Sequence, residues 1–419
     1  MNQMKRILAA ALAMALSLAL FAGCSKGDGP SASSSTPASS SAASSADSAA
    51  EAIQPMDLTG VTDPWLATLG IAGDTVVGKV GEYEITADHL AYWLNYNINY
   101  IAQQYAMYGV TDIPWDSKNS DGFTQAEAVV QASLDLAANY RLTPEIAASK
   151  GLALAEGALD TVSKDIAGIA AQLGSEELAR RYLWLELSDQ QVLEELYTSA
   201  QLGGMLQEHL MGEGTDGYPT DAEVQAYARD ELGIYRVKHI LLASKDTATQ
   251  EPLDEAAVAE KKAQADDLLA QLRAADDPVA LFDTLMKEHS EDPGLATYPD
   301  GYEAHKGQMV PEFEAASLEL KDGEISGVVE SDHGYHIILR LPLDPANYRA
   351  QLVNARMGEM SKGWLDDHGV TTTEAFDKID PADFWLKAQS LQMAVIEEVN
   401  AALAEQEGAA SSSSASSAG

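Results

Sequence analysis

The chain has 419 residues, 46% of them hydrophobic, which is enough apolar sequence to fill two or three folded cores. Its 65 acidic and 26 basic residues give a formal net charge of −39, and such a chain repels nucleic-acid phosphates, which argues against a nucleic-acid-binding function. The single cysteine, Cys24, excludes a disulfide bond within the chain.

The first 23 residues have the pattern of a secretory signal peptide. Basic residues precede an apolar run at 7–21, which is too short for a comfortable membrane span. Residues 20–24 resemble a bacterial lipobox, with Phe21 where leucine is commonest, and this resemblance implies a lipid on Cys24. We therefore expect a lipid anchor that holds the protein on the extracytoplasmic face of a bacterial cell membrane. An ordinary signal peptide with a chance cysteine is the alternative.

Two segments are predicted to lack a folded core. Residues 24–55 are rich in Ser and Ala, cannot bury enough apolar surface to fold, and are expected to form a flexible tether. A tether of this length has a reach of roughly 30 Å. Residues 407–419 have a similar composition and are expected to be a disordered tail.

Residues 56–219 are predicted to form a helical domain that opens with a hairpin at 76–85 and a helix capped by Thr86. Further helices are expected at 124–149, 153–173, 175–182 and 188–211. No residues in this region have the spacing of metal ligands or of a phosphate-binding loop. Aromatic residues along the first helix, such as Trp93 and Tyr100, are interpreted as core. A surface that binds unfolded proteins is the alternative.

Residues 220–345 are predicted to form a second domain, followed by C-terminal helices at 346–406. Thr220 begins a capping box at the start of this domain. We expect strands at 235–242, 325–330 and 335–341, and helices at 253–274, 278–288 and 311–318. This succession predicts a small α+β domain with a mainly antiparallel sheet.

Four motifs in the second domain occur in the order and spacing of parvulin-type peptidyl-prolyl isomerases. They lie at 237–242, 290–292, 307–313 and 334–338. With its lipobox, the chain resembles the PrsA-like foldase lipoproteins, and its N-terminal hairpin and helix resemble the chaperone region of SurA. The resemblance implies an α+β parvulin domain inserted between mainly α-helical chaperone segments, with the C-terminal helices packing on the N-terminal domain.

The resemblance also implies a site. Isomerisation of an X-Pro bond rotates an amide against a barrier of about 18–20 kcal/mol and needs neither a nucleophile nor a metal. By resemblance, Met309 and Phe313 grip the proline ring, and His239, Asp292 and His336 form the catalytic polar group; no cofactor and no metal is expected. The residues alone leave other interpretations open. Met309 and Phe313 can be ordinary core, His239 and His336 can be structural, and Asp292 before Pro293 can simply begin a turn.

One segment departs from the parvulin pattern, which has Gly-Gly-Asp-Leu-Gly followed by a bulky residue and Phe. In residues 298–304 only Asp300 corresponds clearly. We expect Tyr302 to replace the missing apolar wall and to contact the substrate, while Ala304 leaves one position small. His333, in the turn before the last strand, is expected at the rim of the pocket. These departures predict a shallower pocket and weak activity.

These features predict a membrane-anchored foldase that isomerises X-Pro bonds in newly exported, unfolded proteins and also acts as a chaperone. The main alternative is a non-catalytic holdase with a degenerate parvulin domain. A ligand-binding surface lipoprotein has no signature in the sequence, a metal pair at His333 and His336 lacks a third ligand nearby, and no serine-hydrolase elbow is present. Association into a homodimer is left open.

Overall fold

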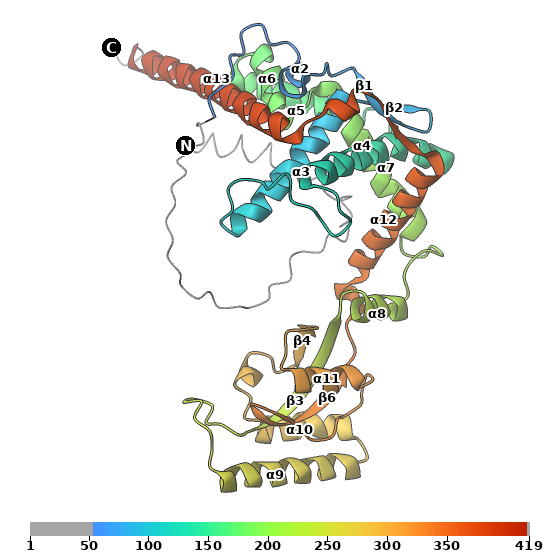
Figure 1. Cartoon of the computed structure of the whole chain (residues 1–419), viewed down its shortest axis with the longest axis vertical. Coiled ribbons are helices and arrows are strands. Elements are labelled where there is room, and N and C mark those ends of the chain that lie inside the picture. The colour runs from blue at the N-terminus through green and yellow to red at the C-terminus, as the bar shows by residue number, and fades with distance from the viewer. Residues whose placement is uncertain (1–52, 417–419) are drawn as a thin grey trace. The chain divides into compact units, whose positions relative to one another are not determined.

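The computed structural model describes residues 53–416, with side chains as far as Gln406 (Figure 1). The predicted signal peptide, Cys24 and most of the predicted tether lie outside the described residues. The chain divides into two compact units: unit 1 runs to Asp216 and resumes at Asn354, and unit 2 comprises Gly217–Val353. Within residues 53–416, no helix combines the length and the apolar character needed to cross a membrane.

Unit 1 consists mainly of helices. They are α2 (Pro64–Leu69), α3 (Ala87–Met107), α4 (Gln125–Ser149), α5 (Asp160–Leu173), α6 (Glu176–Tyr182), α7 (Gln190–Met211) and α13 (Pro381–Ser416), with the short 3-10 turns η2 (Leu183–Glu186) and η5 (Phe376–Lys378). The boundary between the two units falls within α12 (Arg349–His368). The C-terminal helix α13 packs against α2, α3, α4 and α6, so the last helix of the chain shares a core with the first ones (Figure 1).

A small antiparallel sheet joins distant parts of unit 1. Its strands are β1 (Val76–Val80), β2 (Tyr83–Thr86) and β7 (Val370–Thr372), in the order β2-β1-β7. β2 follows β1 through the predicted hairpin, whereas β7 comes from the segment that follows unit 2 in the sequence. The sheet therefore ties the two sequence segments of unit 1 together.

The helix α3 is mostly buried in its first half and becomes more exposed toward its end. Trp93 is buried and its ring lies 4.5 Å, between centroids, from that of Tyr140 in α4. Tyr100 is 58% exposed, Met107 70% and Tyr108 76%. The expectation that the aromatic residues form core is correct for Trp93 and wrong for Tyr100.

The structure differs in detail from three local predictions. α5 begins at Asp160, not at 153, because the chain turns at Gly157, which has a φ of +77°. Thr86 is the N-cap residue of α3, as predicted, but its hydroxyl donates to Asp88 Oδ1 at 2.5 Å and makes no capping hydrogen bond. α13 continues to Ser416, into the segment 407–419 that is expected to be a disordered tail.

Unit 2 is an α+β domain, as predicted. Its elements are α8 (Asp221–Asp230), β3 (Ile234–Ala243), α9 (Glu255–Ala274), α10 (Pro278–His289), η3 (Pro293–Ala296), β4 (Tyr302–His305), α11 (Pro311–Glu319), β5 (Val329–Ser331), β6 (Gly334–Leu341) and η4 (Pro345–Asn347). All strand pairs are antiparallel, in the order β4-β3-β6-β5. β4 was not predicted, and the strand expected at 325–330 is reduced to β5, since Ser326 uses its side chain to bind the Ile338 N–H.

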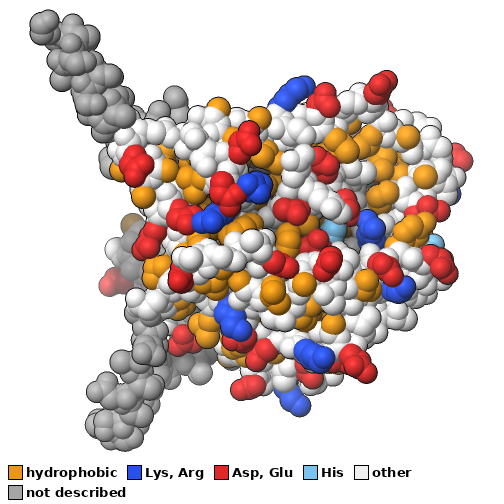
Figure 2. All heavy atoms as spheres, turned by 90° about the horizontal axis from the view of Figure 1, so that it is seen from above, with side chains coloured by type: hydrophobic (Ala, Val, Ile, Leu, Met, Phe, Trp, Pro, Cys, Tyr) orange, Lys and Arg blue, Asp and Glu red, His pale blue; other side chains and the backbone are white. Residues whose placement is uncertain are grey.

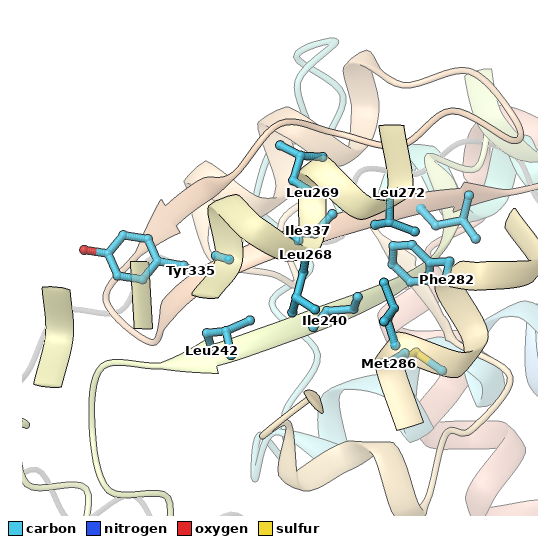
Figure 3. Packing of buried hydrophobic residues seen from close by; sticks show 12 residues of the cluster. Ile240, Leu242, Leu268, Leu269, Leu272, Phe282, Met286, Tyr335 and Ile337 are labelled. Carbon is cyan, nitrogen blue, oxygen red and sulfur yellow. The ribbon is translucent and has the colours of Figure 1, made fainter. Parts of the chain in front are cut away.

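Side-chain alternation separates the two faces of this sheet. On one face, the central strands pack with α9 and α10 around the buried ring of Phe282 (Figure 3). Their residues on this face occupy alternate positions: Ile240, Leu242, Ile337 and Leu339. The intervening residues point to the other face, where Phe313 of α11 packs. His239 and His336 therefore share the face that α11 covers.

Candidate active site

The two histidines come from the two central strands of unit 2. In the register of β3 and β6, His239 lies opposite Ile338, and His336 lies opposite Leu241. His239 and His336 are therefore diagonal neighbours on one face of the sheet. Their Nδ1 atoms are 3.1 Å apart and their rings are stacked with an interplanar angle of 12°. Strand pairing thus brings together two side chains that are 97 positions apart.

Asp292 reaches this face because the segment after α10 is bonded to the edge of β3. The Glu291 N–H donates to the Leu241 carbonyl at 2.8 Å, and the Leu241 N–H donates to Ser290 Oγ at 3.1 Å. Asp292 Oδ2 then lies 3.0 Å from His239 Nε2. The predicted Ser-Glu-Asp motif therefore positions one carboxylate beside one imidazole.

The polar contacts extend from His336 to β5. Ser331 Oγ lies 2.7 Å from His336 Nε2. Burial, followed by the charges of His239 and His333, lowers the pKa of His336 to about 3. The His336 imidazole is therefore neutral at neutral pH and can accept a hydrogen bond at one ring nitrogen while it donates from the other.

Donors surround the Asp292 carboxylate. Oδ1 accepts from the Gly294 N–H at 3.0 Å, and Oδ2 accepts from the Tyr302 hydroxyl at 2.5 Å as well as from His239. Burial raises the pKa of Asp292, but the hydrogen bonds from His239 and Tyr302 outweigh this effect and lower the pKa to about 2. Asp292 is therefore ionised at neutral pH.

Phe313 and Met309 provide the apolar side of the site. The Phe313 ring is buried and packs edge-on against both imidazoles, with centroids 5.1 Å from His239 and 5.2 Å from His336. Met309, just before α11, is partly buried and packs against the same cluster. An apolar surface and a hydrogen-bonded polar group therefore adjoin, which is the usual make-up of a small-ligand site.

Tyr302 and Ser331 take places that the sequence did not predict. The structure directs the Tyr302 hydroxyl to Asp292, and its ring packs edge-on against His239 with centroids 5.6 Å apart. Sequence reasoning missed Ser331 altogether. Its only signal was a polar residue five positions before His336, across a hairpin turn.

His333 lies apart from these contacts. Its side chain is exposed, and its backbone N–H donates to Ser331 Oγ at 3.1 Å. Among the hydrogen bonds of residues 53–416, none involves the His333 imidazole. The same part of the chain holds no group of three or more His, Cys, Asp or Glu side chains arranged to bind a metal ion.

Comparison with known proteins matches residues 239–341 to the rotamase family, described as the PPIC-type PPIASE domain. A foldase protein PrsA of Halalkalibacterium halodurans is 36% identical over 150 residues, which are 35% of this chain and 38% of that protein. The peptidyl-prolyl cis-trans isomerase ESS1 of Saccharomyces cerevisiae is 32% identical over 139 residues, which are 32% of this chain and 79% of that protein.

Solved structures are also similar. The crystal structure of PrsA from Bacillus subtilis is 20% identical, with a TM-score of 0.22, over 66% of this chain and 90% of its own. In sequence, the matches cover about a third of the length of the PrsA foldases and most of the length of the yeast isomerase.

Proposed function

Because the chain belongs to the PPIC-type peptidyl-prolyl isomerase family, we propose that it is a foldase whose unit 2 isomerises X-Pro bonds in unfolded proteins. The observation that supports this proposal most directly is the contact of the Phe313 ring with both His239 and His336. The ring can hold a proline directly beside a fixed polar network. Covalent chemistry at an exposed nucleophile is not required.

The reaction needs an environment in which the twisted amide is bound better than the planar one. A proline ring placed on Phe313 and Met309 removes water from one side of the amide. Rotation then weakens amide resonance and makes the amide less polar. The twisted amide therefore loses less hydration free energy than the planar amide when water is removed. In this proposal His239, His336 and Asp292 form a network that is already hydrogen-bonded, so their dipoles need no reorganisation during the rotation.

The test is an isomerase assay of the full chain on a short X-Pro peptide. We expect Met309→Ala to lower kcat/KM, and Met309→Ala combined with Phe313→Ala to abolish the acceleration. Leu318→Ala changes an exposed residue of the same helix, α11, and serves as the matched control with unchanged activity. An inactive wild-type chain, or a double variant with full activity, would refute catalysis at this site.

We also propose that unit 1 adds chaperone activity. Exposed apolar side chains at the end of α3, namely Tyr100, Met107 and Tyr108, support this idea because they can bind apolar segments of unfolded proteins. Figure 2 shows acidic side chains spread over the visible face, with fewer basic ones among them. The resulting net negative charge keeps a surface with exposed apolar side chains soluble.

The chaperone proposal is tested by suppression of client aggregation. Changing Tyr100 and Tyr108 together to Ser should weaken suppression and leave peptide isomerisation intact. Val279→Ser, at an exposed apolar position of α10 in unit 2, is the control. Suppression without any isomerase activity would favour the non-catalytic holdase.

Anchoring of this foldase to the outer face of a bacterial membrane is the remaining part of the proposal. It is supported by the lipobox pattern that ends at Cys24. Detergent phase partition of the protein expressed in a bacterium decides it: we expect the wild type in the detergent phase and Cys24→Ser in the aqueous phase. A wild-type protein recovered in the aqueous phase would remove the lipid anchor.

A further inference from the structure

The Tyr302 hydroxyl and His239 share one oxygen of Asp292. The hydroxyl lies 2.5 Å from Oδ2, and His239 Nε2 lies 3.0 Å from the same atom. Burial, followed by the hydrogen bond to Asp292 and then the charge of that carboxylate, raises the pKa of Tyr302, so the hydroxyl keeps its proton and acts as the donor. The oxygen that faces His239 is therefore held from a second side.

Gly294 leaves the space that this hydroxyl occupies. A Cβ atom at Gly294 would lie 1.9 Å from Tyr302 Oη and 3.0 Å from its Cζ, which no real side chain allows. The φ of Gly294 lies outside the positive range, so the backbone there does not itself require glycine. Its N–H also binds Asp292 Oδ1 at 3.0 Å. Gly294 thus donates a hydrogen bond to Asp292 Oδ1 and leaves room for the Tyr302 hydroxyl, which donates to Oδ2.

A second glycine directs Tyr302 toward this space. Gly301 has a φ of +98°, and a Cβ there would lie 2.5 Å from the Val237 carbonyl. The chain can therefore turn tightly against β3 just before Tyr302, which begins β4. The tyrosine ring then packs edge-on against His239. Both the ring and the hydroxyl of Tyr302 contact the polar network.

We propose that Tyr302 is a positioning residue for isomerisation: seated over Gly294, it fixes the Asp292 oxygen that orients the His239 imidazole. This inference rests on the proposed isomerase function. This role differs from the expected apolar wall: the Tyr302 ring packs against the cluster that contains Phe313 and Ala304, while its hydroxyl binds Asp292. Tyr302 acts through Asp292 and His239, and Phe313 and Met309 are left to contact the proline.

The two roles predict different kinetics for Tyr302→Phe in the full chain. A positioning hydroxyl predicts a roughly tenfold lower kcat with an unchanged KM, since a hydrogen bond to a charged group is lost. A wall residue predicts unchanged kinetics, because phenylalanine keeps the ring. Tyr298→Phe is the matched control: it removes the hydroxyl of an exposed tyrosine whose ring packs on Tyr302, and should leave kcat unchanged.

A double-variant cycle tests the space over Gly294. Gly294→Ala displaces the hydroxyl and should reproduce the loss caused by Tyr302→Phe. The same change made in the Tyr302→Phe background should add less than it does alone, because the closest contact is gone. Full additivity of the two changes, or an effect of Tyr302→Phe on KM alone, would overturn the proposal.

A readout without catalysis separates this inference from the proposed function. Titration of the Asp292 carboxyl by carbon NMR should give a higher pKa in Tyr302→Phe than in the wild type, since the lost hydrogen bond lowered it, and no change in Tyr298→Phe. If the wild type lacks isomerase activity, the proposed function fails, and the titration still decides whether Tyr302 holds Asp292. An unchanged titration would overturn the inference even in an active enzyme.

Discussion

The Nδ1 atoms of His239 and His336 lie 3.1 Å apart, so one of these two nitrogens donates a hydrogen bond and the other accepts it. When the His239 imidazole is neutral, Asp292 decides the direction, because the ionised carboxylate accepts from His239 Nε2 and leaves His239 Nδ1 as the acceptor. His336 therefore donates from Nδ1 and accepts at Nε2. The Ser331 hydroxyl, 2.7 Å away, is the donor to that nitrogen.

Ser331→Ala should therefore disrupt the hydrogen-bonded network at the end opposite to Asp292. The substitution leaves the buried Nε2 of His336 without a partner, and an unsatisfied buried polar atom costs about 1–3 kcal/mol. We expect lower stability of unit 2 in urea unfolding together with lower kcat. Ser331→Thr retains the hydroxyl and should restore most of both. If Ser331→Ala matches the wild type in both measurements, the proton order derived above is wrong.

The strands and helices of unit 2 could be predicted because their apolar residues repeat clearly. Apolar runs in β3 and β6 mark two strands that are buried along most of their length, and the breaker residues between segments mark their ends. The register could not be predicted in this way. Which residue of β6 faces His239 depends on pairing across 97 positions, and the histidines were placed together by family resemblance alone.

The contacts of Tyr302 show what a sequence pattern omits. A tyrosine in a segment that departs from the family was interpreted as a replacement for a missing apolar residue. Its hydroxyl finds Asp292 only because Gly301 turns the chain and Gly294 leaves room. Both glycines matter because of how closely the folded chain brings them to Val237 and to Tyr302, which the sequence does not show. For the same reason β4, a strand of only four residues, was not predicted.

Phe282→Ala should destabilise unit 2 without touching the polar network. The ring is fully buried among the apolar residues of α9, α10 and the sheet (Figure 3), on the face opposite to the histidines. Truncation of such a ring leaves a cavity and costs about 3–5 kcal/mol. We expect an earlier urea transition for unit 2 and no change in unit 1. Val279→Ala, at an exposed position of the same helix, should leave both transitions in place.

Unit 2 should lose stability in acid. The pKa of His336 is about 3 in the folded chain, below the ordinary value of 6.5, so the unfolded chain binds more protons between these values. Stability therefore falls as the pH decreases from 6.5 toward 3. Urea midpoints of unit 2 measured over this range should decrease, and His336→Gln should flatten the dependence. A midpoint that is independent of pH in the wild type would contradict a neutral buried His336.

Unit 1 should respond to pH with the opposite sign. His89 of α3 lies between two carboxylates, with Nδ1 3.1 Å from Asp88 Oδ1 and Nε2 3.0 Å from Glu195 Oε2 of α7. Burial lowers the pKa of His89, but its hydrogen bond to Asp88 and its ion pair with Glu195 outweigh burial and raise the pKa to about 9. The folded chain then binds an extra proton between 6.5 and 9. The stabilisation is fully present below 6.5 and is lost as the pH rises through 9.

The melting temperature of unit 1 should therefore fall between pH 6.5 and 9, where that of unit 2 is not changed by His336. The shift in pKa corresponds to a contribution on the order of 3 kcal/mol. His89→Gln should remove the dependence by lowering the stability at pH 6.5, and His209→Gln, at an exposed position of α7, is the control. If His89→Gln retains the wild-type dependence on pH, the charged histidine does not hold α3 to α7.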